Sequence, residues 1–268
     1  MPTTSLDARL DAAREIAREA GALALDYFRD LGSLTVERKG VQDEVTAADR
    51  AVEARIRQRL AENFPGEGIL GEEGGLAGSA ASSAHGAEGL WVVDPIDGTA
   101  CFIVGIPVWC VSIAWVVEGE PTIGVVYDPN ADEMFAARRG GGATLNDAPI
   151  RLNSEGTLTD GSVGVGYSMR CRPEDTLRFL EPLLDAGGMF QRNGSGALML
   201  AYVAAGRLLG YYEPHINSWD CLAAICVVNE AGGWTNDFLA GDGLTAGNPI
   251  AAAAPGVTSQ IKSFSGLG

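Results

Sequence analysis

The chain has 268 residues, of which 46% are hydrophobic and 20% charged, and this ordinary globular composition excludes wholesale disorder. The formal net charge of -16 argues against a general binder of nucleic-acid backbones, which needs clustered Lys and Arg. Five scattered cysteines without a CxxC pair fit a reducing compartment better than a disulfide framework. No apolar stretch reaches the ~18–20 residues of a membrane span, and residues 1–11 carry no secretory signal. We therefore expect a cytoplasmic protein that binds neither nucleic acid nor membrane.

The first half of the chain predicts helices beside a run of strands. Small and apolar residues at helical spacing predict an amphipathic helix over residues 6–31. A second helix is expected to start at Thr46 or a neighbouring residue and to stop before Pro65. Apolar runs predict strands at 33–39, 68–71, 90–93, 108–117, 122–127 and 134–137. The low-complexity segment 77–87, with a solvated His85, predicts a surface loop.

The second half of the chain alternates strands with helices. Strands are expected at 162–166, 189–192, 208–213 and 234–235, and helices at 173–184, 193–205 and 217–230. The rhythm changes near residues 140–149, where Gly and turn residues gather. We therefore predict an α+β subdomain over residues 1–143 and an α/β subdomain over residues 144–268.

Two carboxylates follow the apolar run Leu90–Val93. They are Asp94 and Asp97 in the sequence Asp-Pro-Ile-Asp-Gly-Thr, where Pro95 fixes its own φ and stiffens the chain. Asp and Gly are also the commonest turn formers, so an isolated motif of this kind is explained equally well as a turn. Two acids on a stiff turn repel one another unless a cation lies between them. A divalent metal is the simplest such cation.

Other carboxylates also stand where an apolar element meets a loop. Glu72 follows the apolar run 68–71, and Asp220 lies at the start of an apolar helix. Each acid alone has an ordinary explanation; Asp49, for example, would favour the first turn of its helix through the helix dipole. Taken together, these hard oxygen ligands suit Mg²⁺. No cluster of His or Cys offers a rival zinc site.

Three motifs, in this order, make the chain resemble the inositol monophosphatase family of metal-dependent, lithium-sensitive phosphatases. They are Gly71-Glu72-Glu73, the segment 91–99, and Trp219-Asp220 with residues 230–233 downstream. Residues 43–49 match the N-terminal element of the family. The resemblance spans most of the chain and implies an α/β fold built as a layered αβαβα sandwich. It also implies Mg²⁺-dependent hydrolysis of a small phosphorylated metabolite, and a homodimer.

The resemblance assigns roles to single residues. Two to three Mg²⁺ ions per subunit would be held by Glu72, Asp94, the carbonyl of Ile96, Asp97 and Asp220. Asp49 and Thr99 would orient and deprotonate the attacking water, and Glu72 would be a further catalytic residue. Glu73 would support the metal ligands without binding the ion itself. Attack would be direct, without a phosphoenzyme. The substrate would be contacted by Asp97, Gly98, Thr99, Gly194, Ser195, Gly196 and Glu213.

The sequence leaves the substrate open. Glu213 can accept hydrogen bonds from polyol hydroxyls or pair with an amine, so myo-inositol monophosphate and histidinol phosphate both fit. Few Lys and Arg near the motifs disfavour doubly charged substrates such as 3′-phosphoadenosine 5′-phosphate and fructose bisphosphate. Some relatives act as partners of RNA polymerase or in ribosome assembly, which implies a non-catalytic role through a protein partner as another alternative.

Departures from the family pattern are concentrated on the substrate side and remove no metal ligand. Cys101 stands where the family commonly has Asn, and Met199 occupies a position that is often polar. Ala223-Ala224 replaces a frequent glycine. Whether His215 or Cys101 touches the substrate is left open by the sequence.

Overall fold

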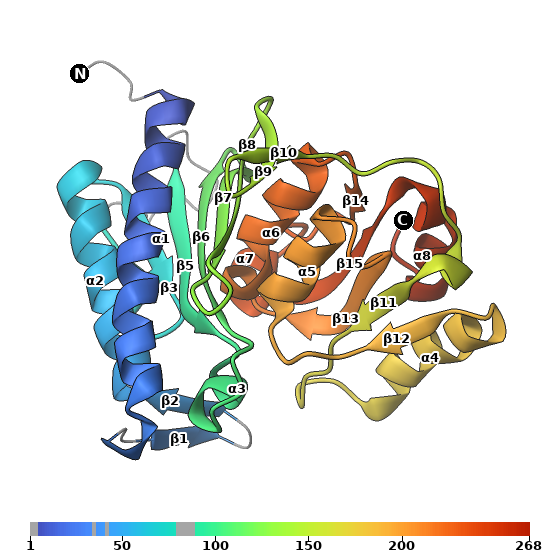
Figure 1. Cartoon of the computed structure of the whole chain (residues 1–268), viewed down its shortest axis with the longest axis horizontal. Helices are drawn as coiled ribbons and strands as arrows, with labels where there is room; N and C mark the ends of the chain where they lie inside the picture. The colour runs from blue at the N-terminus through green and yellow to red at the C-terminus, as the bar shows by residue number, and fades with distance from the viewer. Residues whose placement is uncertain (1–4, 34–35, 41–42, 79–88) are drawn as a thin grey trace.

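The computed structural model describes residues 5–33, 36–40, 43–78 and 89–268. Residues 79–87 of the expected loop, His85 among them, lie outside the described residues. Two large sheets and the helices around them form five layers, helix–sheet–helix–sheet–helix (Figure 1). The predicted αβαβα sandwich of the α/β class is confirmed. One outer helix layer consists of α1 (Leu6–Arg29) and α2 (Ala47–Asn63). The middle layer consists of α5 (Gly196–Ala204) and α6 (Ser218–Glu230), and the other outer layer of α4 (Pro173–Asp185) and α8 (Thr258–Ser265).

The first sheet has eight strands in the order β10-β9-β8-β7-β6-β5-β3-β4. Only β3 and β5 pair in parallel; the other neighbours are antiparallel. The strands are β3 (Gly68–Gly71), β4 (Gly75–Ala77), β5 (Leu90–Asp97), β6 (Cys110–Val117), β7 (Glu120–Asp128), β8 (Glu133–Arg138), β9 (Gly142–Leu145) and β10 (Ala148–Ile150). A separate two-stranded sheet pairs β1 (Val36–Gly40) with β2 (Asp43–Thr46).

Two findings correct the expected strands. β5 does not end at Val93 but continues through Asp97, because its pairing with β6 shifts register between Asp94 and Asp97 instead of stopping. The strands β9 and β10 were not expected, since the segment 140–149 around them is rich in turn residues, and neither were β2, β4 and β15 (Asn248–Ala253). The predicted subdomain boundary at 143/144 falls inside β9, and the chain passes from the first sheet to the second between Ile150 and Ser162.

The second sheet is mixed and has five strands in the order β12-β11-β13-β15-β14. Its strands are β11 (Ser162–Val165), β12 (Met189–Gln191), β13 (Gly210–Ile216), β14 (Trp234–Thr235) and β15 (Asn248–Ala253). β11 pairs in parallel with β12 and β13, whereas β15 runs antiparallel to both of its neighbours. Two short helices, α3 (Thr99–Ile103) and α7 (Gly243–Ala246), complete the α-helices of the described residues. None of the described helices is long and apolar enough to cross a membrane.

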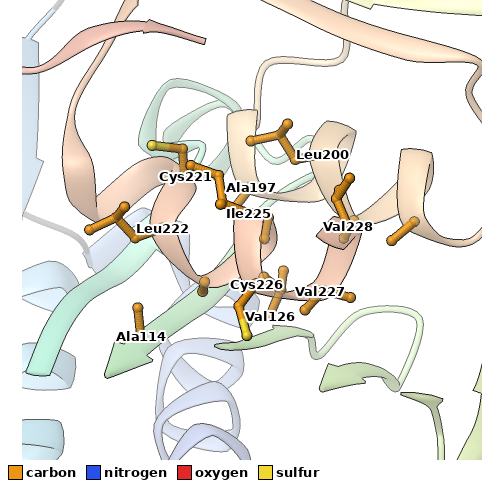
Figure 2. Close-up of a cluster of buried hydrophobic side chains, with 14 of the residues drawn as sticks. Ala114, Val126, Ala197, Leu200, Cys221, Leu222, Ile225, Cys226, Val227 and Val228 are labelled. Carbon is orange, nitrogen blue, oxygen red and sulfur yellow. The ribbon is translucent and has the colours of Figure 1, made fainter. Parts of the chain in front are cut away.

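Strand alternation sends successive residues to different cores. Trp91 and Val93 of β5 pack with α1 and α2, whereas Val92 between them packs against α5 and α6. Tyr211 of β13 faces the same middle core, and Tyr212 faces α4 and α8. Figure 2 shows the middle core, where side chains of α5 and α6 meet those of the first sheet. α6 is buried on nearly every side because it lies between two sheets.

Glycine at position 124 sets how closely α6 approaches the first sheet. A Cβ at Gly124 of β7 would lie 2.0 Å from the carbonyl oxygen of Ala223 in α6, so no larger residue fits this contact. The helix therefore lies directly on the sheet. Its N-terminus, which carries Asp220, is fixed relative to the strands that carry the other acids.

Candidate metal centre and substrate cleft

Glu72 and Asp94 stand side by side because β3 and β5 are parallel. Gly71 pairs with Val93, and the N–H of Glu72 donates to the Val93 carbonyl at 3.3 Å. The two acids are therefore the first residues beyond matching positions of neighbouring strands. The Asp94 carboxylate accepts the N–H of Ile96 at 2.9 Å, the hydrogen bond of an Asx turn. Asp94 is therefore a turn residue, and the same turn orients its carboxylate.

Asp97 joins the two halves of the chain. One of its oxygens accepts hydrogen bonds from the Ser195 hydroxyl and, at 2.8 Å, from the N–H of Ala197. Both donors belong to the start of α5, where Ser195 is the N-cap. Because Asp97 lies at the end of β5, this contact fixes the start of α5 against the first sheet.

Asp220 is the third residue of α6 and is held by the cap of its own helix. Its carboxylate accepts the N–H of Asn217 at 3.1 Å and the Asn217 side-chain amide at 3.3 Å. Asp94, Asp97 and Asp220 each place one carboxylate oxygen within 4.8 Å of the others. Acids separated by more than 120 residues thus meet at one point.

The electrostatics of this cluster call for a cation. Burial, followed by the neighbouring carboxylates, raises the pKa of Asp94 and of Glu72 well above their ordinary values. Burial is also the main cause that raises the pKa of Asp97 to about 6 and of Asp220 to about 8. Within the described residues, no Lys or Arg forms an ion pair with any of these four acids. An all-oxygen donor set without a cationic partner fits a hard divalent ion such as Mg²⁺.

Asp49 and Thr99 lie together beside the cluster. Asp49 is the third residue of α2, and one of its oxygens accepts the N–H of Thr46 at 2.8 Å and the Thr46 hydroxyl at 2.6 Å. The Thr99 hydroxyl lies 3.3 Å from the other oxygen and 3.0 Å from the Ile96 carbonyl. A hydroxyl has one hydrogen, so it can donate to only one of these acceptors at a time. Burial raises the pKa of Asp49, and the hydrogen bonds from Thr46 oppose this shift.

A cavity of about 1080 Å³ opens over the acids, between the two sheets. The expected metal ligands form one wall. The expected substrate residues also line it: Asp97, Gly98, Thr99, Gly194, Ser195, Gly196 and Glu213. Asp49 and Cys101 are outside the lining, whereas Met199 and His215 belong to it. The structure thus brings the predicted site residues to one place, with Asp49 touching it through Thr99.

The two residues that the sequence left open lie in different positions. Cys101 does not line the cavity but contacts the segment that does, since its Sγ donates to the carbonyl of Asn193, next to Gly194, at 3.4 Å. Gly194 next to it has φ of 104°, and a Cβ there would lie 2.6 Å from Cys101 Sγ. His215 lines the cavity, and its Nε2 lies 2.9 Å from the carbonyl of Ala246. A carbonyl only accepts, so Nε2 carries the hydrogen.

Glu213 is a buried acid on the wall opposite the cluster. It accepts the Tyr211 hydroxyl at 2.6 Å, and a Cβ at Gly166 would lie 2.2 Å from it. Burial raises the pKa of Glu213 to about 7, against the effect of the Tyr211 hydrogen bond. The two arginines nearby, Arg192 and Arg170, also lower this pKa.

Arg170 and Arg192 line the cavity and were missed by sequence reasoning. The expectation of few basic groups near the site was wrong for this wall. Neither guanidinium has an ion pair or hydrogen bond within the described residues. Both side chains are exposed, so their donors are accessible from solvent. Two signals were present in the sequence. Arg192 directly precedes the Gly/Ser helix start, and Arg170 follows the end of the parallel strand β11, where α/β sheets place their ligand-binding loops.

The fold and the site define a class: a layered α/β protein with a cluster of carboxylates, suited to a metal ion, between two sheets. The profile of the inositol monophosphatase family matches residues 5–263, and the chain belongs to that family. Members of this family are metal-dependent phosphatases, and the cluster of Asp94, Asp97 and Asp220 is suited to a metal ion.

Similar proteins carry two different names. The chain is 41% identical over 228 residues to "Nus factor SuhB" of Xylella fastidiosa, covering 84% of this chain and 80% of that protein. It is 37% identical over 240 residues to "Inositol-1-monophosphatase" of Rhizobium meliloti, covering 88% and 86%. Among solved structures, the extragenic suppressor protein suhB of Bartonella henselae superposes with a TM-score of 0.87 at 32% identity, covering 96% of this chain and 98% of that one.

Proposed function

We propose that this protein hydrolyses a small phosphate monoester in a Mg²⁺-dependent reaction, with myo-inositol monophosphate as the first candidate substrate. The observation that carries the proposal is the cluster of acids on one wall of the cavity, without a basic partner in the described part of the chain. Two to three Mg²⁺ per subunit would be held by Glu72, Asp94, the Ile96 carbonyl, Asp97 and Asp220. When bound, Mg²⁺ supplies charge neutralisation for the phosphate and the leaving oxygen.

Asp49 and Thr99 are proposed to receive the proton of the attacking water. When the Thr99 hydroxyl donates to Asp49, its lone pairs accept a hydrogen bond from water and point that water at the phosphorus. The water proton then passes through Thr99 to Asp49, whose raised pKa makes it a better base. Attack in line displaces the alcohol directly, so no residue of the chain is phosphorylated. Gly98 and Thr99 contact the phosphate from the start of α3.

The opposite wall is proposed to hold the alcohol part of the substrate. Gly194, Ser195 and Gly196 leave room beside the acids, and Glu213 faces the same space. With a pKa of about 7, Glu213 can donate or accept a hydrogen bond near neutral pH, which suits the hydroxyls of a polyol. An amine is less suited to this wall, because Arg170 and Arg192 would repel it. The wall therefore favours a polyol phosphate over histidinol phosphate.

A second candidate substrate carries another anionic group. Arg170 and Arg192 line the cavity without ion pairs in the described residues, and guanidinium groups bind phosphate through several hydrogen bonds. A sugar bisphosphate such as fructose bisphosphate would place its second phosphate there. The names of relatives called Nus factors support a different alternative, a role through a protein partner.

A substrate panel tests these candidates. Phosphate release is measured from myo-inositol 1-phosphate, fructose 1,6-bisphosphate and histidinol phosphate with Mg²⁺, with chelator and with added Li⁺. We expect Mg²⁺-dependent turnover of inositol phosphate that chelator abolishes and Li⁺ inhibits. No Mg²⁺-dependent turnover of any monoester would overturn the enzyme proposal and leave the protein-partner role. Light scattering during gel filtration tests the expected homodimer.

A further inference from the structure

The turn that carries Glu72 is tied to helix α2 by one buried carboxylate. β3 ends at Gly71 and β4 begins at Gly75, so the turn has three residues. Glu53 of α2 is only 3% exposed and accepts the N–H of Glu73 at 2.7 Å and the N–H of Gly74 at 2.8 Å. Each carboxylate oxygen takes one of these two bonds. The backbone directly after Glu72 is therefore fixed to α2.

Arg57, one helical turn along α2, neutralises this buried acid. Its Nε donates to Glu53 at 2.7 Å, and its Nη2 donates to the carbonyl of Gly75 at 2.6 Å. The Glu53–Arg57 pair thus contacts both ends of the turn. Only glycine allows so close an approach, since a Cβ at Gly71 or at Gly74 would lie 2.6 or 2.7 Å from Glu53 Oε1.

The Glu72 carboxylate needs such support because its neighbours repel it. Like charges on Asp220, Glu73 and Asp49 act on it, and a free turn would let it swing toward solvent. Its own N–H is bonded to the Val93 carbonyl, and the next two N–H groups are bonded to Glu53. Three consecutive amides are therefore held, on one side by β5 and on the other by α2.

We propose that Glu53, paired with Arg57, is a positioning residue that holds the Glu72 turn over the acid cluster and thereby sets the affinity of the centre for divalent cations. The proposal rests on the proposed function, because it takes Glu72 as a metal ligand. Glu53 itself touches neither substrate nor metal. Its effect reaches the site through the backbone of residues 72–74.

The experiment compares Glu53→Gln with Glu62→Gln, an equal change of charge at an exposed position of the same helix. In Glu53→Gln, one carboxylate oxygen is replaced by an NH₂ group, which cannot accept the backbone N–H that faces it. One hydrogen bond to the turn and the ion pair with Arg57 are therefore lost. Free Mn²⁺ is titrated into each protein and followed by electron paramagnetic resonance, and Mg²⁺ activation of phosphate release is measured alongside. Changes behind a metal ligand weaken metal binding by roughly 10–100-fold, so we expect the Mn²⁺ Kd of Glu53→Gln to rise about tenfold. Its kcat at saturating Mg²⁺ should stay close to that of the wild type, and Glu62→Gln should match the wild type throughout.

An unchanged Mn²⁺ Kd in folded Glu53→Gln would overturn the positioning role. If that variant does not fold, Arg57→Gln decides, because the Arg57 side chain is 20% exposed and its loss leaves both N–H bonds to Glu53 in place. We expect a smaller rise of the Mn²⁺ Kd there, and an unchanged value would again overturn the proposal. The proposed function fails separately, when the wild type binds Mn²⁺ and still releases no phosphate.

Discussion

The cleft has two walls, which are built by different means. The acid wall carries Glu72, Asp94, Asp97 and Asp220, and the opposite wall carries Arg170, Arg192, Glu213 and residues 194–196. The acid wall consists of residues at strand ends and helix starts, each fixed by backbone hydrogen bonds: Asp94 by Ile96, Asp220 by Asn217, and Asp97 by Ala197. The opposite wall includes a loop after β11 in which Met169 is 56% exposed and Arg170 is unpaired within the described residues. A rigid wall suits chemistry that needs fixed geometry, and an adaptable wall suits selection among substrates. Reaction type and substrate preference should therefore respond to different substitutions.

The largest expected effect comes from Asp94→Asn on the acid wall. Asp94 belongs to the group of carboxylates whose oxygens lie within 4.8 Å of one another, and its replacement should lower Mg²⁺-dependent turnover by roughly 10²–10³-fold, the scale of losing a central electrostatic group. The fold should persist, because the substitution relieves like-charge repulsion in the metal-free protein. Phosphate release and thermal unfolding with chelator measure the two effects. Asp185→Asn, an exposed change on α4, is the matched control; retained turnover in Asp94→Asn would show that the metal assignment is wrong.

On the opposite wall, the pair Arg170→Gln and Arg192→Gln should change preference rather than chemistry. Losing charge-assisted bonds to a second phosphate should lower kcat/KM for fructose 1,6-bisphosphate by roughly 10–100-fold. The value for inositol 1-phosphate should change by less than about threefold. Arg178→Gln, on α4 and outside the cavity lining, should leave both unchanged. An equal loss for both substrates would mean that the two walls are not separable.

The acid wall should also make metal-free protein sensitive to pH. The pKa values of Asp97 (about 6) and Asp220 (about 8) lie above the ordinary 3.8, so between these values the folded state holds more protons than the unfolded state. Stability must then fall as pH rises from 5 to 8. With chelator, we expect Tm to fall by several degrees across this range, and with Mg²⁺ the fall should be much smaller. Identical pH profiles with and without Mg²⁺ would contradict a metal at these acids.

Local signals in the sequence predicted the elements that carry the acids, and the resemblance to the family supplied the roles of these acids as metal ligands. Thr46 as the cap of α2, the stiff turn after Asp94 and the start of α6 at Asn217 are all encoded within a few residues. Period-two and helical patterns likewise predicted most of the elements, whereas their arrangement in five layers followed from the resemblance to the family. These features depend on neighbours in the chain, so they can be read without knowing the fold.

The remainder depended on contacts between distant segments. Glu53 lies among ordinary charged residues of a helix, and its partners are backbone N–H groups 20 and 21 residues away. Half of β15 is alanine, and only its place between β13 and β14 makes it a strand. Arg170 reaches the cavity because β11 ends there. Glu53 and β15 have no signature in the sequence around them, and Arg170 is marked only by its place after strand β11.

The smallest expected effect concerns the point where the two walls meet. Ser195 caps α5 by accepting the N–H of Leu198 at 3.2 Å, and its hydroxyl donates to Asp97. Ser195→Ala removes both bonds, and losing a helix cap costs about 1 kcal/mol of stability. Asp97 keeps the N–H of Ala197, so kcat should fall only a few-fold, whereas KM should rise because the start of α5 also lines the substrate side. Ser154→Ala, an exposed serine outside the cavity lining, is the control. A loss of kcat as large as that of Asp94→Asn would mean that Ser195, at the junction of the two walls, takes part in the reaction itself.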